Sequence, residues 1–441
     1  MATNEILALL SIVSFFSMLA IGMPVALTLA VSGLVFGYLG FGPGLFNPLP
    51  ARIFGVTANY TLIAIPLFVF MGVMLEKSKI ADDLMDVIGH LAGSLRGGMG
   101  IGIILVGVLM GATTGIVGAT IVTLGLITLP ALIRRNYDLP TACGTICASG
   151  TLGQIIPPST ILILLADIMG QSVGTLFAAA LFPGLMLSAI FVIYLLVLGM
   201  VRPEMVPPVA LAERDAMNRG DLWRKAAMVG LPPIALVLAV LGSIIGGIAA
   251  PTEAASMGAL GSVLVVALSG RFSFGVLRET TLSTTRITAG MMFILICAQV
   301  FALTFRGLGG EGLVHRLFEW VPGGVNGDVI FMLLLIFVLG FFIEWIEISY
   351  IVVPLFLPIL MNANVDMVWI AALIALVLQT SFLTPPFGWA LFYLRSVAPP
   401  SVPTIAIYKG VVPFIGLQLI AVALLFLFPG IATWLPRAIG W

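Results

Sequence analysis

Long apolar stretches separated by short polar segments make up most of the chain, and they predict membrane-spanning helices. A helix needs roughly 20 apolar residues to cross a bilayer core about 30 Å thick. Ten stretches reach or approach that length and predict ten crossings. They cover residues 6–21, 24–40, 56–75, 139–169, 173–200, 226–249, 253–270, 284–305, 367–397 and 404–428.

Two further apolar blocks, residues 98–133 and 328–361, are longer and carry glycine or acidic residues near their midpoints. Each is either one overlong broken helix or a re-entrant hairpin of two half-helices. Lysine and arginine beside membrane spans tend to stay in the cytoplasm. Arg96 precedes the first block and Arg134 follows it, so both of its ends carry the cytoplasmic mark and a hairpin is predicted.

The second block has the opposite charge pattern. No lysine or arginine occurs between Arg316 and Arg395, so its ends are predicted to be periplasmic. The linker at residues 201–225 carries five basic residues, which predicts a cytoplasmic location. With an odd number of crossings in each half, both chain termini are predicted to be periplasmic.

The two halves repeat one order of parts. Inverted repeats with paired discontinuous helices are typical of secondary transporters, so the predicted fold class is an all-α polytopic membrane protein with inverted repeats, two re-entrant hairpins and two broken helices. A shift of 228 residues aligns Gly33 with Gly261, Pro130 with Pro358, and Pro157-Pro158 with Pro385-Pro386.

The predicted division follows that repeat. The first repeat, 1–200, holds scaffold spans (1–75), an arm (76–97), a hairpin (98–135), a broken span (139–169) and a closing span (173–200). The linker occupies 201–225. The second repeat, 226–441, holds scaffold spans (226–305), an arm (306–322), a hairpin (328–361), a broken span (367–397) and a closing span (404–428).

The amino-acid composition limits the classes of function that the protein can have. Hydrophobic residues make up 61% of the 441 residues and charged residues 9%, against about 25% charged in soluble proteins. A net charge of zero argues against nucleic acid as a partner. Three cysteines and two histidines suggest neither a disulfide framework nor a metal or catalytic cluster, so an enzyme is not predicted.

Four interrupted elements carry the candidate transport chemistry: the hairpin tips at 111–120 and 340–349, and the broken spans around 149–160 and 379–386. Proline removes a backbone donor and clashes with the preceding turn, so a Pro-Pro pair in a membrane frees carbonyl groups. Carbonyl and hydroxyl oxygens are suitable ligands for sodium. The N-termini of half-helices suit a substrate carboxylate.

Three charged residues lie in or near these elements. Glu344 and Glu347 are three residues apart on one helical face, and a carboxylate inside the membrane costs about 3 kcal/mol. They are candidate cation ligands or proton carriers, unless they lie near the aqueous periplasmic mouth. Arg395 either meets a substrate carboxylate or extends to the cytoplasmic interface.

At these residues the sequence resembles a known family. The runs at 154–159, 251–254, 340–358 and 379–388 are similar to those of the large, DctM-like membrane subunit of tripartite ATP-independent periplasmic (TRAP) transporters. The resemblance covers essentially the whole chain. One departure is Glu344, where the family often has aspartate, which lengthens the reach of the carboxylate.

The resemblance implies sodium-driven import of a small organic anion across the bacterial inner membrane. A periplasmic substrate-binding protein would deliver the anion, and a separate small membrane subunit of about four spans would complete the complex within the lipid. It also implies an elevator mechanism, in which the hairpins and broken spans move against the scaffold. Sodium is the one coupling ion, or cofactor, that it implies.

By this resemblance the sodium sites map to the two clusters of hairpin tip and broken span, with the substrate between them. The implied sodium residues are Thr113, Thr114, Gly118, Ser149, Gly150, Thr151, Gly340, Gln379, Thr380, Ser381 and Thr384. The residues that contact the substrate or shape its site are Gly153, Gln154, Pro157, Pro158, Glu344, Glu347, Pro385, Pro386 and Arg395.

Other readings stay open. A stand-alone, ion-coupled organic-anion symporter could have the same fold and need no binding protein. A channel is less consistent with the sequence, because charged rings and a repeated filter motif are absent. The sequence does not name the organic anion or the sodium stoichiometry.

Overall fold

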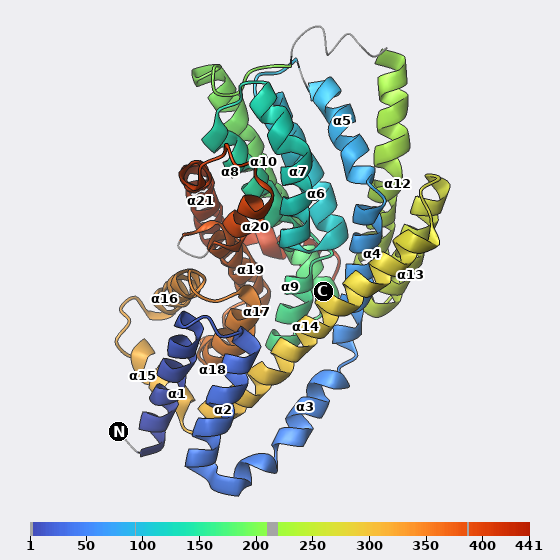
Figure 1. Ribbon diagram of the computed structural model, residues 1–441. Coiled ribbons are helices and arrows are strands. Elements are labelled where there is room, and N and C mark those ends of the chain that lie inside the picture. Colours follow the sequence, from blue (N-terminus) through green and yellow to red (C-terminus); the bar gives the residue numbers. More distant parts are fainter. Residues whose placement is uncertain (1–2, 93, 210–218, 386–387) are drawn as a thin grey trace.

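The computed structural model describes residues 3–92, 94–209, 219–385 and 388–441, and every regular element within them is a helix. Nine of the described helices are long and apolar enough to cross a membrane, or ten if one bent pair is counted as a span. The predicted all-α polytopic fold is therefore confirmed (Figure 1).

The first part of the chain builds one side of a scaffold. Its helices are α1 (Thr3–Ala20), α2 (Val25–Phe41), α3 (Leu49–Thr57), α4 (Ala64–Lys77) and α5 (Ile80–Ala92).

The predicted span at 56–75 corresponds to the end of α3 and most of α4, and these two parts meet at a bend of 48°. The side-chain oxygen of Asn59 accepts a hydrogen bond from the backbone N–H of Thr61 at 2.9 Å. This local turn competes with continuous helix and explains the break.

The first hairpin and broken span follow. The helices are α6 (Gly98–Thr114), α7 (Val117–Arg134), α8 (Leu139–Thr151), α9 (Thr160–Met169) and α10 (Val173–Val201), with a short 3-10 turn, η3 (Leu152–Gln154), after α8.

The second part of the chain returns to the scaffold before forming its own hairpin. Its scaffold helices are α12 (Arg219–Ile245), α13 (Pro251–Leu268), α14 (Phe274–Gly307) and α15 (Gly310–Phe318). Helix α14 begins ten residues before the predicted start at 284. Its first turns are polar, and the Ser273 hydroxyl caps them by accepting from the Val276 N–H at 3.1 Å.

The remaining helices form the second hairpin, the second broken span and the closing span. They are α16 (Gly324–Leu339), α17 (Trp345–Glu347), the π turn η4 (Ile348–Val352), α18 (Val353–Asn362), α19 (Met367–Leu383), α20 (Trp389–Val397), α21 (Thr404–Leu427) and α22 (Gly430–Ala438). Helix α22 was not predicted from the apolar pattern.

The halves pack on each other reciprocally. Helix α2 of the first half lies on α14 of the second, and α13 of the second half lies on α4 of the first. Likewise α8 packs on α21, and α10 packs on α19. In each of these two sets, the second contact is the first with the roles of the two repeats swapped. A pseudo-two-fold axis between the repeats requires this pattern.

Small residues allow these close approaches. A Cβ on Gly33 would lie 2.9 Å from the Cα of Phe301 in α14, and one on Gly144 of α8 would collide with the backbone of Gly410 in α21. Small residues at such crossings are typical of helix pairs in membranes.

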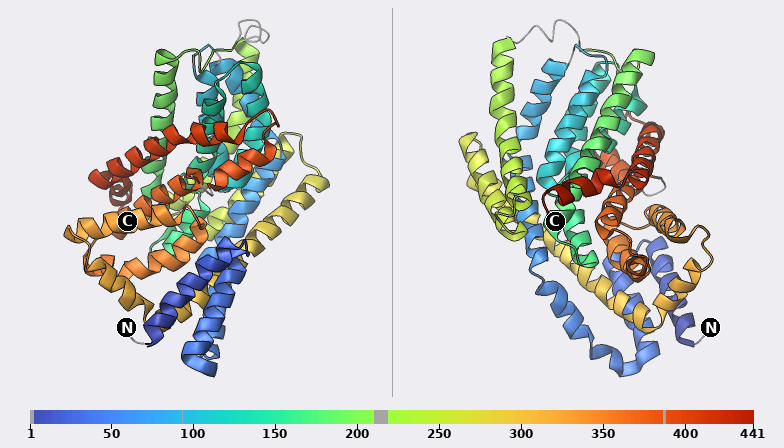
Figure 2. Two further views of the ribbon diagram at one scale, coloured as in Figure 1. Left: turned by 60° about the vertical axis from the view of Figure 1, so that its left-hand side comes forward. Right: turned by 180° about the vertical axis from the view of Figure 1, so that it is seen from behind.

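Two groups of helices are used below. The scaffold comprises α1–α5 and α12–α15, and the hairpin unit comprises α6–α9 and α16–α20. In Figure 1, α12 and α13 lie on one side of the molecule and α16 and α21 on the other, with α6, α7 and α9 between them. The right-hand view in Figure 2 shows the same arrangement from behind.

Candidate functional site

The tip of the first hairpin lies against the break in the first broken span. A Cβ on Gly111 would collide with the backbone of Gly153, and one on Gly115 would lie 3.5 Å from the N atom of Thr160. The Thr160 hydroxyl also donates to the Gly115 carbonyl at 3.3 Å. The structure therefore brings together residues that the sequence reading assigned to one site.

The hydroxyl groups of this cluster point their protons into their own helices. Thr113 donates to the carbonyl of Met110 at 2.8 Å, and Ser149 donates to that of Thr145 at 2.6 Å. Thr151 donates to the Ala148 carbonyl at 2.8 Å. A hydroxyl that donates in this way keeps its oxygen lone pairs, which are the part that a cation uses.

Four helix ends meet at this tip and break. Helices α6 and α8 end here, and helices α7 and α9 begin here. The partial negative charge at a helix C-terminus favours a cation, and the partial positive charge at an N-terminus favours a carboxylate. The cluster therefore has surroundings suited to both kinds of ion.

The second cluster repeats this geometry. A Cβ on Gly340, at the end of α16, would collide with the side chain of Ser381 in α19. The contact matches the one between Gly111 and Gly153, since the residues are separated by close to the 228-residue repeat spacing. Thr380 donates to its own helix at 2.6 Å.

Ser381 and Thr384 complete the hydroxyl groups of the second cluster. The Ser381 hydroxyl donates to the carbonyl of Leu378 at 2.5 Å, and that of Thr384 donates to the carbonyl of Thr380 at 2.6 Å. The oxygens of this cluster therefore keep their lone pairs as those of the first cluster do.

Glu347 and Gln379 are the most unusual side chains of the second cluster. Both are fully buried, and neither oxygen of the Glu347 carboxylate nor either polar atom of the Gln379 amide has a hydrogen-bond partner within the described structure. Buried polar groups nearly always have partners, so such atoms suggest a ligand that completes them. Glu344, by contrast, is half-buried at the start of α17.

The remaining predicted residues have varied surroundings. Gln154 is buried, and its side-chain oxygen has no hydrogen-bond partner within the described structure. Pro157 and Pro158 are buried at the first break, and Pro385 is half-buried at the second. A Cβ on Gly150 would meet the side chain of Ile121 in α7.

Three predicted residues stand apart. Gly118 packs against the ring of Tyr393 in α20. Arg395 is exposed, and its guanidinium donates to the Val402 carbonyl at 2.6 Å, outside both clusters. The Arg395 guanidinium thus points toward the loop before α21, and its contact with a substrate stays a prediction. The side chain of Thr114 and all of Pro386 lie outside the described residues.

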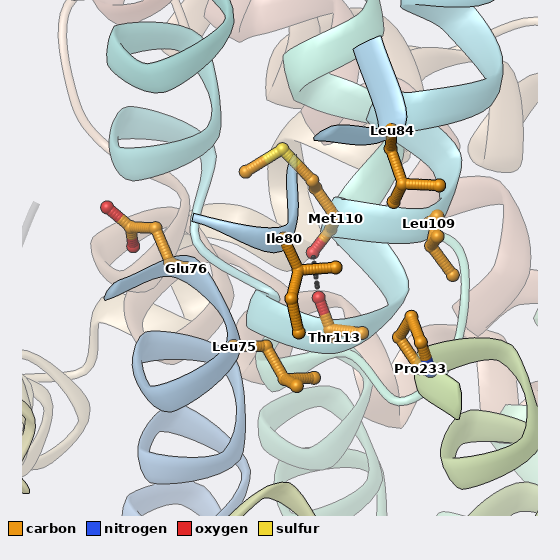
Figure 3. Close-up of a pocket in the computed structure, with 8 residues that line it drawn as sticks. All are labelled: Leu75, Glu76, Ile80, Leu84, Leu109, Met110, Thr113 and Pro233. Atoms are coloured by element: carbon orange, nitrogen blue, oxygen red, sulfur yellow. Dashed lines mark hydrogen bonds between the residues drawn. The ribbon is translucent and has the colours of Figure 1, made fainter. Parts of the chain in front are cut away.

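A small cavity adjoins the first hairpin. It measures about 20 Å³, which is room for one water molecule, and it lies between Thr113 of α6 and residues of α4, α5 and α12 (Figure 3). The carboxylate of Glu76 points away from the other lining residues. It accepts a long hydrogen bond from Thr123 of α7 at 3.5 Å. This seam is too small for an organic anion.

Comparison with known proteins identifies the family. A family model described as the DctM component of the tripartite ATP-independent periplasmic transporter matches residues 12–431. This chain belongs to the DctM family. The large permease protein DctM of the C4-dicarboxylate TRAP transporter of Pseudomonas aeruginosa is 30% identical over 406 residues, or 91% of this chain and 92% of that protein.

Two other proteins place the DctM-family chain in context. The large permease protein TeaC of the ectoine TRAP transporter of Halomonas elongata is 29% identical over 437 residues, or 96% of this chain and 97% of that protein. The fold is similar to that in the crystal structure of the Alcanivorax borkumensis YdaH transporter, with a TM-score of 0.63, 16% identity and 89% of each chain covered.

The sequence reading of this DctM-family protein missed two polar contacts between the scaffold and the hairpin unit. One joins Glu76 to Thr123 and the other joins Asn59 to Asp167. An acidic residue at the end of an apolar span, as at Glu76, was the available signal. No sequence signal could have shown the pairing of Asn59 with Asp167, because 108 residues separate them.

Proposed function

We propose that this chain is the large membrane subunit of a sodium-coupled TRAP transporter of the bacterial inner membrane that imports a small organic anion. The observation that carries the proposal is the full burial of Glu347 in the second hairpin and of Gln379 in the second broken span, with side-chain polar atoms that lack partners in the described structure. Oxygens held in this way suit a cation that arrives from solution.

Sodium coupling follows from the types of oxygen present. Hydroxyl, amide and backbone carbonyl oxygens lie at both clusters, the second cluster adds the carboxylate of Glu347, and hard cations prefer such ligands. We assign the predicted threonine, serine, glycine and glutamine residues of each cluster to one sodium site. The cargo would lie between the two sites, near the N-termini of α7 and α9.

Two partners complete the proposal. A periplasmic substrate-binding protein would deliver the anion, and a separate small membrane subunit of about four spans would bind the scaffold. Relatives carry names for transport of C4-dicarboxylates and ectoine, so a small carboxylated molecule is the proposed cargo class. Both chain termini would face the periplasm.

Movement would follow the elevator pattern. The hairpin unit contacts the scaffold along α4, α5 and α14, and small residues bring its own helices close together. Because the helices of the hairpin unit pack closely on one another, the unit can move as one rigid body against the scaffold. Cargo and sodium would then cross the membrane with it.

Reconstitution tests the function. Liposomes are prepared with this chain alone, and with its proposed binding protein and small membrane subunit. We expect uptake of labelled carboxylates only with both partners and an inward sodium gradient. Uptake by this chain alone would support a stand-alone symporter instead. Undiminished uptake with only a proton gradient would contradict sodium coupling and make Glu344 and Glu347 candidate proton carriers.

A further inference from the structure

A second polar pocket lies apart from the two clusters, between the scaffold and the hairpin unit. It has a volume of about 280 Å³. Helix α3, the turn η2 (Thr61–Ile63) and helix α14 form its scaffold side, and helix α9 and the π turn η4 form its other side. Its polar lining residues are Arg52, Asn59, Asp167, Gln299 and Tyr350.

The acid of this pocket is held from both sides. The side-chain amide of Asn59, on the scaffold, donates to one carboxylate oxygen of Asp167 at 2.5 Å. The hydroxyl of Tyr350, in the second hairpin, donates to the other oxygen at 3.2 Å. Two neutral donors thus fix the carboxylate, and each of its oxygens keeps a further lone pair that can accept from a ligand.

The cation of the pocket is available. Arg52 is exposed on α3, and no carboxylate among the described residues forms an ion pair with it. A guanidinium presents several N–H donors in a plane that matches a carboxylate. The side-chain amide of Gln299 in α14 adds further donors to the same pocket. A carboxylated molecule is therefore the ligand that these groups favour.

The position of the pocket gives its side of the membrane. Asp167 lies near the beginning of α10, and the basic linker at 201–225 follows the other end of that 29-residue helix. Helix α3 also lies at the end of the molecule opposite the start of α12 (Figure 1). If the basic linker is cytoplasmic, the pocket opens toward the periplasm.

We propose that this pocket is an outer binding subsite for a small carboxylate, with Arg52 holding the carboxylate and Asp167 accepting from a hydroxyl or ammonium group of the same ligand. The inference rests on the proposed transport function. A space of about 280 Å³ suits a molecule of few heavy atoms. Since the two units each supply part of the lining, their relative movement would take the subsite apart and release the ligand.

Thiol labelling tests binding at the subsite directly. A Cβ on Gly55, which lines the pocket, meets nothing within 4 Å, so Gly55→Cys fits there. The native cysteines are buried, which keeps background labelling low. The variant complex, with the small subunit and the loaded binding protein, is treated from outside with a membrane-impermeant maleimide. The probes are malate, which is a hydroxylated C4-dicarboxylate, and ectoine, each at saturating concentration.

We expect the transported probe to slow labelling of Gly55→Cys at least fivefold. Gly44→Cys is the matched control, because a Cβ there also meets nothing within 4 Å and Gly44 lies outside the pocket. Its labelling should not change. Equal labelling of Gly55→Cys with and without a probe that the complex transports would overturn the proposal.

Substitution of the arginine gives a second readout. Arg52→Gln should lower uptake about tenfold at low cargo concentration, with a smaller loss at saturation, and Arg52→Lys should recover part of it. Arg316→Gln, which removes an arginine paired with Glu5, should leave uptake unchanged. Unchanged uptake by Arg52→Gln would reject the subsite. Absence of uptake by the unsubstituted complex would instead reject the proposed function.

Discussion

Single buried polar side chains carry the most specific information in this molecule. Glu347 and Gln379 have no hydrogen-bond partner in the described structure, although burying such groups without partners is costly. A protein keeps such groups when something binds them. Both lie within the hairpin tip or broken span of the second repeat, so their roles can be tested one at a time.

Glu347→Gln removes the charge and keeps the size of the side chain. If sodium binds there, saturating sodium should stabilise the unsubstituted protein by about 2.7 kcal/mol at 100 times its dissociation constant. The variant should lose most of that gain, and sodium-driven uptake should fall at least tenfold. Thermal unfolding with sodium or potassium measures the gain.

Glu319→Gln, in an exposed acid directly after α15, is the control and should keep the sodium response. A full sodium response in Glu347→Gln would exclude Glu347 as a ligand.

Gln379→Leu separates a ligand from a packing residue. Leucine fills similar space without polar atoms, so it should leave the free energy of unfolding unchanged or raise it when sodium is absent. We expect the sodium-dependent shift in unfolding temperature to shrink at least twofold.

Gln418→Leu is a matched control, since Gln418 is also fully buried and has no partner for its amide within the described structure. It lies in α21, which belongs to neither a hairpin tip nor a broken span, and its variant should keep the full shift. Equal shifts in the two variants would remove Gln379 from the site.

At the scale of helices, close contacts between hairpin and broken span define the site. Such contacts need glycine, because a Cβ on Gly111 has no room against the backbone of Gly153. The backbone of the hairpin tip is thereby held close to the backbone of the broken span. The same contact recurs between Gly340 and Ser381, so it is part of the repeated design.

Gly111→Ala should therefore lower the free energy of unfolding by about 1–3 kcal/mol, since overpacking forces the two segments apart. Gly416→Ala, in α21, meets nothing within 4 Å and should leave stability unchanged or raise it by about 0.5–1 kcal/mol. Thermal unfolding in detergent compares the two variants. A loss in Gly416→Ala as large as that in Gly111→Ala would contradict this explanation.

Helix positions were largely predictable, because apolar runs and basic flanks leave a strong pattern. The bend after α3 was not, since it depends on one side chain, Asn59, that turns back on its own backbone. The start of α14 was also missed, because its first turns are polar. Hydropathy detects apolar residues rather than helix as such.

The candidate site was predictable in outline only. Sequence placed Gly111 and Gly153 in one cluster, and the structure brings them into contact. The full burial of Glu347 and the turn of Arg395 toward Val402 depend on tertiary packing, which no local pattern reports. The direct sodium roles stay predictions.

At the scale of the whole molecule, the hairpin unit and the scaffold must separate for transport to occur. Two side-chain contacts join them among the bonds described above, and the one between Glu76 of α4 and Thr123 of α7 measures 3.5 Å. The other contact joins Asn59 to Asp167 of α9. A bridge at either contact should arrest the movement.

Replacing Glu76 and Thr123 together by cysteine provides such a bridge. Mercuric ion should link the two thiols, stop carboxylate uptake almost completely, and release it again when excess thiol is added. Each single substitution should lose little uptake on the same treatment. Full uptake by the double variant, with the bridge verified by mass spectrometry, would argue against relative movement of the two units at this contact.

The reciprocal packing of the halves has a consequence for how such a protein can be assembled and inherited. Helix α2 finds its neighbour in α14, and α13 finds its neighbour in α4. Each half therefore completes the burial of the other's helices. If the gene were divided at the linker, the two polypeptides should form the complete fold only when they are made together.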